Sequence, residues 1–240
     1  MHPVSDLLED AAAFARGHEV PWPRDPDAAP APGGTPFGVH HDDPPPYNRL
    51  RGPLQARGPQ SGAVWQHARE IAAWGEPARA DLTFSIAKTY LALLGGGQGF
   101  AWHGYDDAWV ELPGVGRVPS VPGGSHWGGG VSISARDQAR IGQLLLDGGA
   151  VGGRQLVPRA WIERMAEPSP IAPFYGRLLW LNRDGRAIPG ASPQTMLMYG
   201  AGGHYTWSDP ATQAVVVLRW LDPAHVAEAM QRFSAALARG

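Results

Sequence analysis

The only lysine of the chain, Lys88, stands three residues after Ser85, and every other side chain of fixed positive charge is an arginine. An ammonium group can give up its proton when it is removed from water, whereas a guanidinium effectively cannot. Residues i and i+3 share one face of a helix, so a neutral lysine there lies close enough to take the proton of the serine hydroxyl. The pair predicts a serine nucleophile with a lysine as its general base.

The segment that carries this pair is expected to be a buried helix. Asp81 or Thr83 can cap its start, and the residues from 84 to 94 are apolar on nearly every face. A lysine inside such a helix loses hydration, which lowers its pKa and prepares it for a role as a base. A serine and a lysine at this spacing also occur together by chance, so the motif is specific only in combination with the surrounding segments.

Composition excludes several other classes of protein. The chain has 240 residues, a net charge of −2 and no cysteine, which rules out disulfides, thiolate metal sites and a cysteine nucleophile. The small net charge argues against a nucleic acid or an anionic membrane as partner. The acidic N-terminus lacks the features of a secretory signal, so we expect a cytoplasmic protein. No cofactor is expected.

The order of patterns predicts an α+β fold in which helices flank an antiparallel sheet. Residues 1–46 are expected to form a short helix and a proline-rich arm, and residues 47–240 a single domain. His40, His41, Asp42 and Asp43 in the arm could bind a metal, but a solvated turn is the favoured interpretation, and no metal site is predicted. The expected helices and strands are these: helices at 5–16, 84–94, 134–145, 158–165 and 224–239, and strands at 62–66, 70–75, 178–181, 196–199, 204–207 and 214–220.

Several stretches together resemble the serine β-lactamase-related hydrolases, the superfamily of class C β-lactamases, DD-peptidases, family VIII esterases and aminohexanoate-dimer hydrolases. They run from Trp74 to Lys88, from His126 to Gly130, from Ser132 to Arg140 and from Tyr199 to His204. Their order and spacing are far more specific than Ser-x-x-Lys alone. The resemblance implies a β-lactamase/transpeptidase-like fold and covers most of residues 60 to 240.

The resemblance also implies a set of roles. It makes Ser85 the nucleophile that forms an acyl-enzyme, Lys88 the base, and the backbone N–H groups of Ser85 and Ala201 the oxyanion hole. An ester or amide of a small molecule would be the substrate. The residues that it places around this substrate are His126, Trp127, Tyr199, Gly200, Gly202 and His204. The stretch from Met198 to Gly200 falls where relatives have a Lys-Thr-Gly-type motif, and the missing cation there argues against recognition of a β-lactam carboxylate.

One element of the family is absent from the sequence. Relatives carry a Tyr-x-Asn or Ser-x-Asn motif in a helical subdomain after the nucleophile helix, and this chain has neither motif. Only thirteen residues separate Lys88 from Trp102, so a deletion of the subdomain is predicted, with its junction near residues 95–101. The loss would expose an apolar face around Tyr90, Leu91 and Leu94 through which the chain could self-associate.

Three functions remain open at this point. The first is a serine hydrolase in which another side chain replaces the missing base, the candidates being His126, His204, Tyr105 and Tyr199. The second is a catalytically inactive remnant that keeps the fold as a binding or interaction domain. The third, a metal-dependent hydrolase, is disfavoured because the histidines lack a paired spacing.

Overall fold

A six-stranded antiparallel sheet forms the centre of the part of the chain that the structure describes. The computed structural model describes residues 3–25, 56–95, 109–112, 116–119 and 131–240. Within them the strands lie in the order β2-β1-β12-β11-β10-β9, and each neighbouring pair is antiparallel. The strands of this sheet are β1 (Ser61–Gln66), β2 (Arg69–Trp74), β9 (Trp180–Leu181), β10 (Met196–Gly200), β11 (His204–Asp209) and β12 (Ala214–Arg219).

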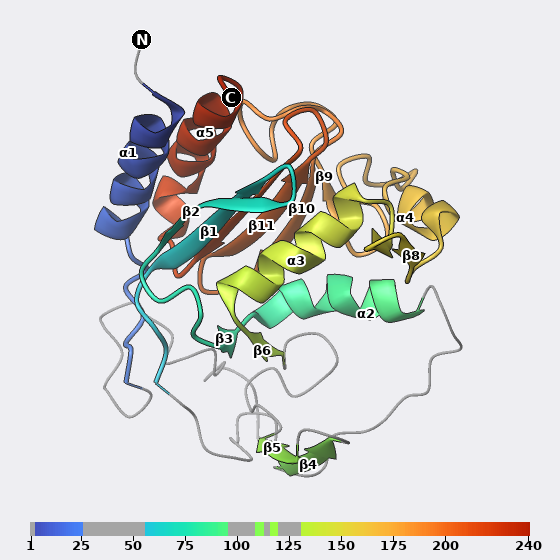
Figure 1. Cartoon of the computed structure of the whole chain (residues 1–240), viewed down its shortest axis with the longest axis horizontal. Helices are drawn as coiled ribbons and strands as arrows, with labels where there is room; N and C mark the ends of the chain where they lie inside the picture. Colours follow the sequence, from blue (N-terminus) through green and yellow to red (C-terminus); the bar gives the residue numbers. More distant parts are fainter. Residues whose placement is uncertain (1–2, 26–55, 96–108, 113–115, 120–130) are drawn as a thin grey trace.

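Helices cover both faces of this sheet (Figure 1). On one face α1 and α5 pack against each other and against the sheet, with Leu8, Trp207 and Phe233 in the core between them. On the other face α3 crosses β1, β12 and β11, and α2 lies beside it. The helices are α1 (Val4–Gly17), α2 (Ala87–Gly95), α3 (Ala135–Leu146), α4 (Arg159–Met165) and α5 (Val226–Leu237), with short 3-10 turns η1 (Phe84–Ile86) and η2 (Pro223–His225).

Alternation along the strands decides which side chains face which helices. On β11, Tyr205 and Trp207 belong to the core under α1 and α5, whereas Ser208 donates a hydrogen bond to the carbonyl of Gly142 in α3. His204 and Thr206 share the face of Ser208, so the α2/α3 side of β11 is polar. The remaining strands form three two-stranded pairs: β3 (Asp81–Leu82) with β6 (Ser132–Ile133), β4 (Trp109–Leu112) with β5 (Gly116–Pro119), and β7 (Ala150–Val151) with β8 (Arg154–Gln155).

The sequence-based expectation of an α+β fold with helices on an antiparallel sheet is confirmed. Both expected hairpins, β1–β2 and β11–β12, are present. At the start of α3 the N-cap half of the expected capping box is present, since Ser134 Oγ accepts a hydrogen bond from the backbone N–H of Asp137. These features were predictable because they depend on residues close together in the sequence.

Two expectations about the nucleophile helix were wrong. Neither Asp81 nor Thr83 caps it with a side chain; Thr83 stands at the N-cap position of η1 without a capping bond, and Asp81 lies in β3. Tyr90, expected on an exposed face, is only 9% exposed and packs with Ile86 in the core between α2 and the sheet. Burial of Tyr90 removes it from any surface for self-association.

The predicted deletion junction lies largely outside the described residues, because α2 ends at Gly95 and the description resumes at Trp109. In the described residues between α2 and α3 there is the β4–β5 ribbon and β6, and no further helix. The extent of the domain and the deletion itself therefore stay predictions, as does the proline-rich arm beyond residue 25.

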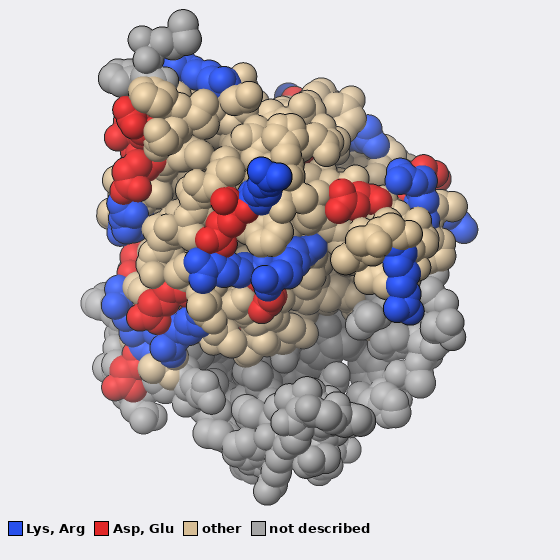
Figure 2. Space-filling model, viewed as in Figure 1, with Lys and Arg blue, Asp and Glu red and all other residues tan. Residues whose placement is uncertain are grey.

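The described surface carries both signs of charge close together. Figure 2 shows basic and acidic side chains side by side on the face that it presents, as expected from the small net charge. Several are ion pairs, such as Arg136 with Glu70 and Arg140 with Asp137. Among the helices that the structure describes, none has the length and apolar character needed to cross a membrane.

Candidate active site

Ser85 and Lys88 meet at the junction of η1 and α2. Ser85 lies in the 3-10 turn and Lys88 in the first turn of the α-helix that follows it, and both are partly exposed. Lys88 Nζ donates a hydrogen bond to Ser85 Oγ over 2.7 Å. The two reactive groups predicted from their spacing are thus in direct contact.

Partial burial shifts the protonation equilibrium of Lys88 in the direction that a base requires. Removal of water around the ammonium lowers the pKa of Lys88 below its ordinary value. A larger fraction of the amine is then neutral near physiological pH, and a neutral amine can accept a proton from the neighbouring hydroxyl. The direction of this shift is the one expected from the apolar helix.

Contacts on several sides fix the turn that carries Ser85 in place. Thr83 donates to the carbonyl of Val131 from its backbone N–H over 2.8 Å and from its hydroxyl over 3.0 Å. Thr89 Oγ1 donates to the carbonyl of Leu178 over 2.6 Å, and Ile86 is fully buried. These bonds join the turn to the residue before β6 and to the segment before β9, which limits movement of Ser85.

The end of β10 packs against the same turn. A Cβ atom on Gly200 would lie 2.3 Å from the carbonyl oxygen of Thr83, so only glycine allows this approach. Ala201 follows in an exposed turn, and Gly202 comes next with φ of +75°. The structure therefore brings together the two segments whose N–H groups are expected to form the oxyanion hole.

Two of the expected substrate-binding side chains lie elsewhere. His204 is fully buried and packs between Phe84 and Trp220, with ring centroids 5.6 and 4.3 Å away. Burial, with Arg219 and Arg57 nearby, lowers the pKa of His204 well below its ordinary value, so the ring is neutral. No surface of His204 is left for a ligand, which corrects the expectation for this residue.

Tyr199 is exposed, and its ring lies on the face of β10 opposite to the core that α2 covers. Its ring stacks on Tyr205, with centroids 5.0 Å apart, and Tyr205 belongs to the core under α1 and α5. Its neighbour Met198 packs on the opposite face with the α2 core. The structure therefore does not bring the side chain of Tyr199 to Ser85.

The chain is similar in fold to known proteins. No family model matches the chain. A β-lactamase from Mycobacterium bovis superposes with a TM-score of 0.55 at 13% identity, covering 75% of this chain and 94% of that one. A Bacillus anthracis protein assigned as a 6-aminohexanoate-dimer hydrolase gives a TM-score of 0.53 at 12% identity, covering 75% of this chain and 79% of that one. These two structures show that the chain has a β-lactamase-like fold.

A sequence relative is similar to part of the chain. A 6-aminohexanoate-dimer hydrolase from Paenarthrobacter ureafaciens is 32% identical over an alignment of 111 residues, and the match covers 40% of this chain. The match spans only 26% of the length of that relative. The solved structures support the β-lactamase-like fold, and this local match adds a relation in sequence.

Other expected residues of the β-lactamase-like site fall outside the description. His126 and Trp127, expected to contact substrate, and Tyr105, a candidate replacement base, belong to segments that the structure does not describe. Their roles stay predictions. Within the described residues, no three His, Asp or Glu side chains gather as a set of metal ligands.

A buried ionic network that the sequence did not predict lies behind the turn that carries Ser85. Asp81 and Arg219 form an ion pair over 2.5 Å, with side chains 5% and 0% exposed. Arg57 pairs with Glu19 over 2.6 Å and lies over the ring of Trp220. A signal was present, because one arginine ends the otherwise apolar strand from Ala214, and a buried cation requires a partner.

Proposed function

We propose that the chain is a serine hydrolase that cleaves an ester or an amide through an acyl-enzyme on Ser85, with Lys88 as the base. The observation that carries this proposal is the 2.7 Å contact between Lys88 Nζ and Ser85 Oγ at an amine whose pKa is lowered. The β-lactamase-like fold supports it, and η1, which carries Ser85, contacts β10 and β11 of the central sheet.

The reaction would proceed in two halves. Ser85 Oγ attacks the substrate carbonyl carbon while the neutral amine of Lys88 takes the hydroxyl proton. The N–H groups of Ser85 and Ala201 donate to the oxyanion that develops; loss of one such donor typically costs about 10²–10³ in rate. Collapse of the tetrahedral intermediate breaks the ester or amide bond, and the leaving alcohol or amine takes the proton from Lys88. Water then attacks the acyl group on Ser85, which releases the acid and restores the hydroxyl.

The missing cation of the Lys-Thr-Gly-type motif favours a substrate other than a β-lactam. Met198 stands where a cation would be expected to bind the carboxylate, and its side chain is 1% exposed. Small acyl esters are therefore the first substrates to test. Linear amides of ω-amino acids are the second, because the partial relative is a 6-aminohexanoate-dimer hydrolase.

A binding domain without turnover is the alternative. It is favoured by the absence of a Tyr-x-Asn or Ser-x-Asn motif from the sequence, since this motif supplies the second base group in related enzymes. The chain would also self-associate through the apolar face of α2. Of the residues expected on this face, Leu91 is half-buried. The cytoplasmic location expected from the N-terminus also remains a prediction.

The decisive experiment is covalent labelling. Incubation with a fluorophosphonate probe, followed by peptide mass spectrometry, is expected to place the adduct on Ser85, and hydrolysis of p-nitrophenyl acetate should be measurable. Ser85→Ala should abolish both signals, while Ser5→Ala, at an exposed serine of α1, should change neither. Labelling that persists in Ser85→Ala removes Ser85 from the role. Binding of an ester by calorimetry without turnover would favour the alternative.

A further inference from the structure

Phe84, the residue before the nucleophile, has an unusual backbone conformation. Its φ is +50°, a left-handed value that a bulky aromatic residue rarely adopts. Such a conformation is costly and persists only where the surroundings impose it, and conformations of this kind cluster at functional sites. Because Phe84 and Ser85 share a peptide bond, the conformation of Phe84 sets the direction of the Ser85 N–H.

Aromatic rings surround Phe84 and hold it there. Trp22 and Trp220 meet its ring edge to face, at centroid distances of 5.8 and 6.0 Å and interplanar angles of 84° and 88°. His204 lies on a further side. Phe84 itself is 6% exposed. Perpendicular ring contacts of this type favour one ring position over others.

The same two tryptophans also contact the other half of the expected oxyanion hole. A Cβ atom on Gly202 would lie 3.0 Å from a ring carbon of Trp22 and 3.0 Å from one of Trp220. Gly202 directly follows Ala201, whose N–H is the second expected donor. Trp22 and Trp220 therefore touch the residue before one donor and the residue after the other.

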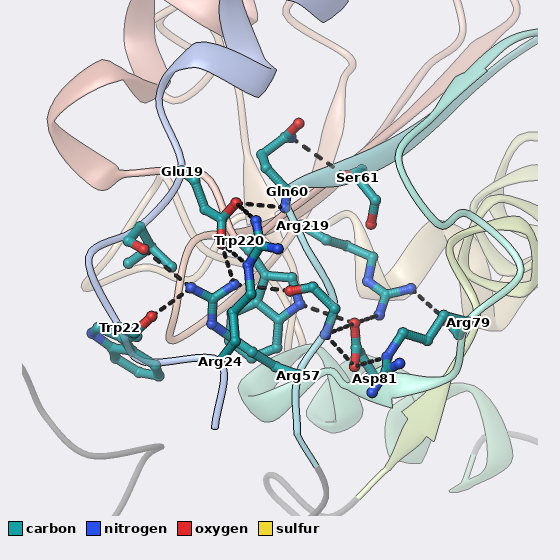
Figure 3. A network of polar contacts seen from close by, with 12 residues as sticks. Glu19, Trp22, Arg24, Arg57, Gln60, Ser61, Arg79, Asp81, Arg219 and Trp220 are labelled. Carbon is teal, nitrogen blue, oxygen red and sulfur yellow. Dashed lines mark hydrogen bonds and ion pairs between the residues drawn. The ribbon is translucent and has the colours of Figure 1, made fainter. Parts of the chain in front are cut away.

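Trp22 reaches this place through the buried network (Figure 3). The guanidinium of Arg57 donates to the carbonyls of Trp22 over 2.5 Å and Val20 over 3.2 Å, and it pairs with Glu19. It also lies 4.8 Å from the centroid of the Trp220 ring.

Trp220 is fixed independently on its other side. Its Nε1 donates to Asp81 Oδ2 over 3.0 Å, and its carbonyl accepts a hydrogen bond from the backbone N–H of Val20 over 2.8 Å. The N-terminal segment after α1 is thus bound to the end of β12 and to the turn that carries Ser85.

We propose that Trp22 is a positioning residue for the oxyanion hole. By packing against Phe84 and Gly202 together, its ring sets the separation and direction of the N–H groups of Ser85 and Ala201. Residues 19–22 are therefore part of the hydrolytic site, although they precede the nucleophile by more than sixty residues and lie outside the stretches that resemble the superfamily. This inference rests on the proposed function of Ser85.

The test compares three variants in the full chain. Trp22→Ala removes the ring and Trp22→Phe keeps an aromatic ring at the position. Trp65→Ala is the matched control, because Trp65 is also partly buried but contacts Arg140 on the α3 side. Thermal unfolding is recorded for each variant, and the rate of fluorophosphonate labelling is measured across pH.

Trp22→Ala is expected to lower the labelling rate by about tenfold or more, with about 10²–10³ as the limit set by the loss of one donor. The midpoint of its pH profile should not move, because Lys88 is untouched. Trp22→Phe should restore most of the rate, and Trp65→Ala should label like the wild type. Wild-type labelling by Trp22→Ala, an equal loss in Trp65→Ala, or a shifted pH midpoint would overturn the inference.

A readout independent of reaction separates this inference from the proposed function. In heteronuclear NMR spectra, the amide signals of Ser85 and Ala201 should both move in Trp22→Ala and stay in place in Trp65→Ala. If the wild type is not labelled, the proposed function fails, and amide signals that move would still support the contact that Trp22 makes. If the wild type is labelled but neither amide responds to Trp22→Ala, only the inference about Trp22 fails.

Discussion

The ion pair between Asp81 and Arg219 should be the most sensitive point of the fold to a single substitution. Besides the guanidinium of Arg219 at 2.5 Å, the Asp81 carboxylate accepts hydrogen bonds from Gly58 N over 3.2 Å, Trp220 Nε1 over 3.0 Å and Arg79 Nε over 3.3 Å. Asp81→Asn keeps the size of the side chain but removes its charge, and it leaves the fully buried guanidinium without a counter-charge.

The expected loss follows from that burial. Removal of one partner from a buried ion pair typically lowers the free energy of unfolding by about 3–5 kcal/mol. An exposed pair behaves differently: Glu228→Gln, which breaks the pair with Arg232 on the surface of α5, should cost no more than about 0.5 kcal/mol. The contrast between the two variants isolates the effect of burial.

Equilibrium unfolding in urea, followed by tryptophan fluorescence, measures both values. Because a loss of this size is a large part of an ordinary domain's stability, the double variant Asp81→Asn/Arg219→Met should be prepared in parallel. It removes both charges, so it should lose much less than the sum of the two single substitutions. A loss below about 1 kcal/mol for Asp81→Asn, or a double variant that is strictly additive, would refute the assigned role of the pair.

Three further predictions concern the reaction. Lys88→Arg keeps the charge but cannot supply a base, so labelling of Ser85 should fall by about 10²–10⁴-fold; an unchanged rate would remove Lys88 from this role. Because burial lowers the pKa of Lys88 and the neutral amine is the active form, the rate should rise with pH to a midpoint below 10.5, and a midpoint at or above 10.5 would contradict the base assignment. Gly200→Ala places a Cβ against the carbonyl of Thr83 and should cost up to about 10²-fold in labelling rate, whereas Gly17→Ala, with open space around it, should not; equal rates for the two would show that the close approach is unimportant.

The features that the sequence predicted correctly depend on short separations along the chain. Ser85 and Lys88 meet because residues three apart share a helical face, and Ser134 caps α3 because it stands three residues before Asp137. The two hairpins likewise join strands that follow one another. Even the lowered pKa of Lys88 was accessible, since an apolar helix must be buried.

The expectations that failed depend on contacts across the fold. Asp81 looks like a helix cap by position, but its carboxylate forms a buried ion pair with Arg219, which lies 138 residues later in the sequence. His204 looks like a site residue because it follows a glycine-rich turn, yet the register of β11 directs it into the core. Short-range patterns do not encode such choices, because a side chain's burial is decided by which distant strand lies beside it.

The sequence by itself determined the contact between Ser85 and Lys88 and the class of fold, since spacing, periodicity and capping act within a few residues. Only the tertiary structure decided how the pair is supported. It brought the rings of Trp22 and Trp220, which are 198 residues apart in the sequence, to a centroid distance of 6.3 Å, where both contact Phe84 and Gly202. It also buried the charges of Asp81 and Arg219, which the sequence pattern alone would leave in water, because the two residues become neighbours only in the folded sheet.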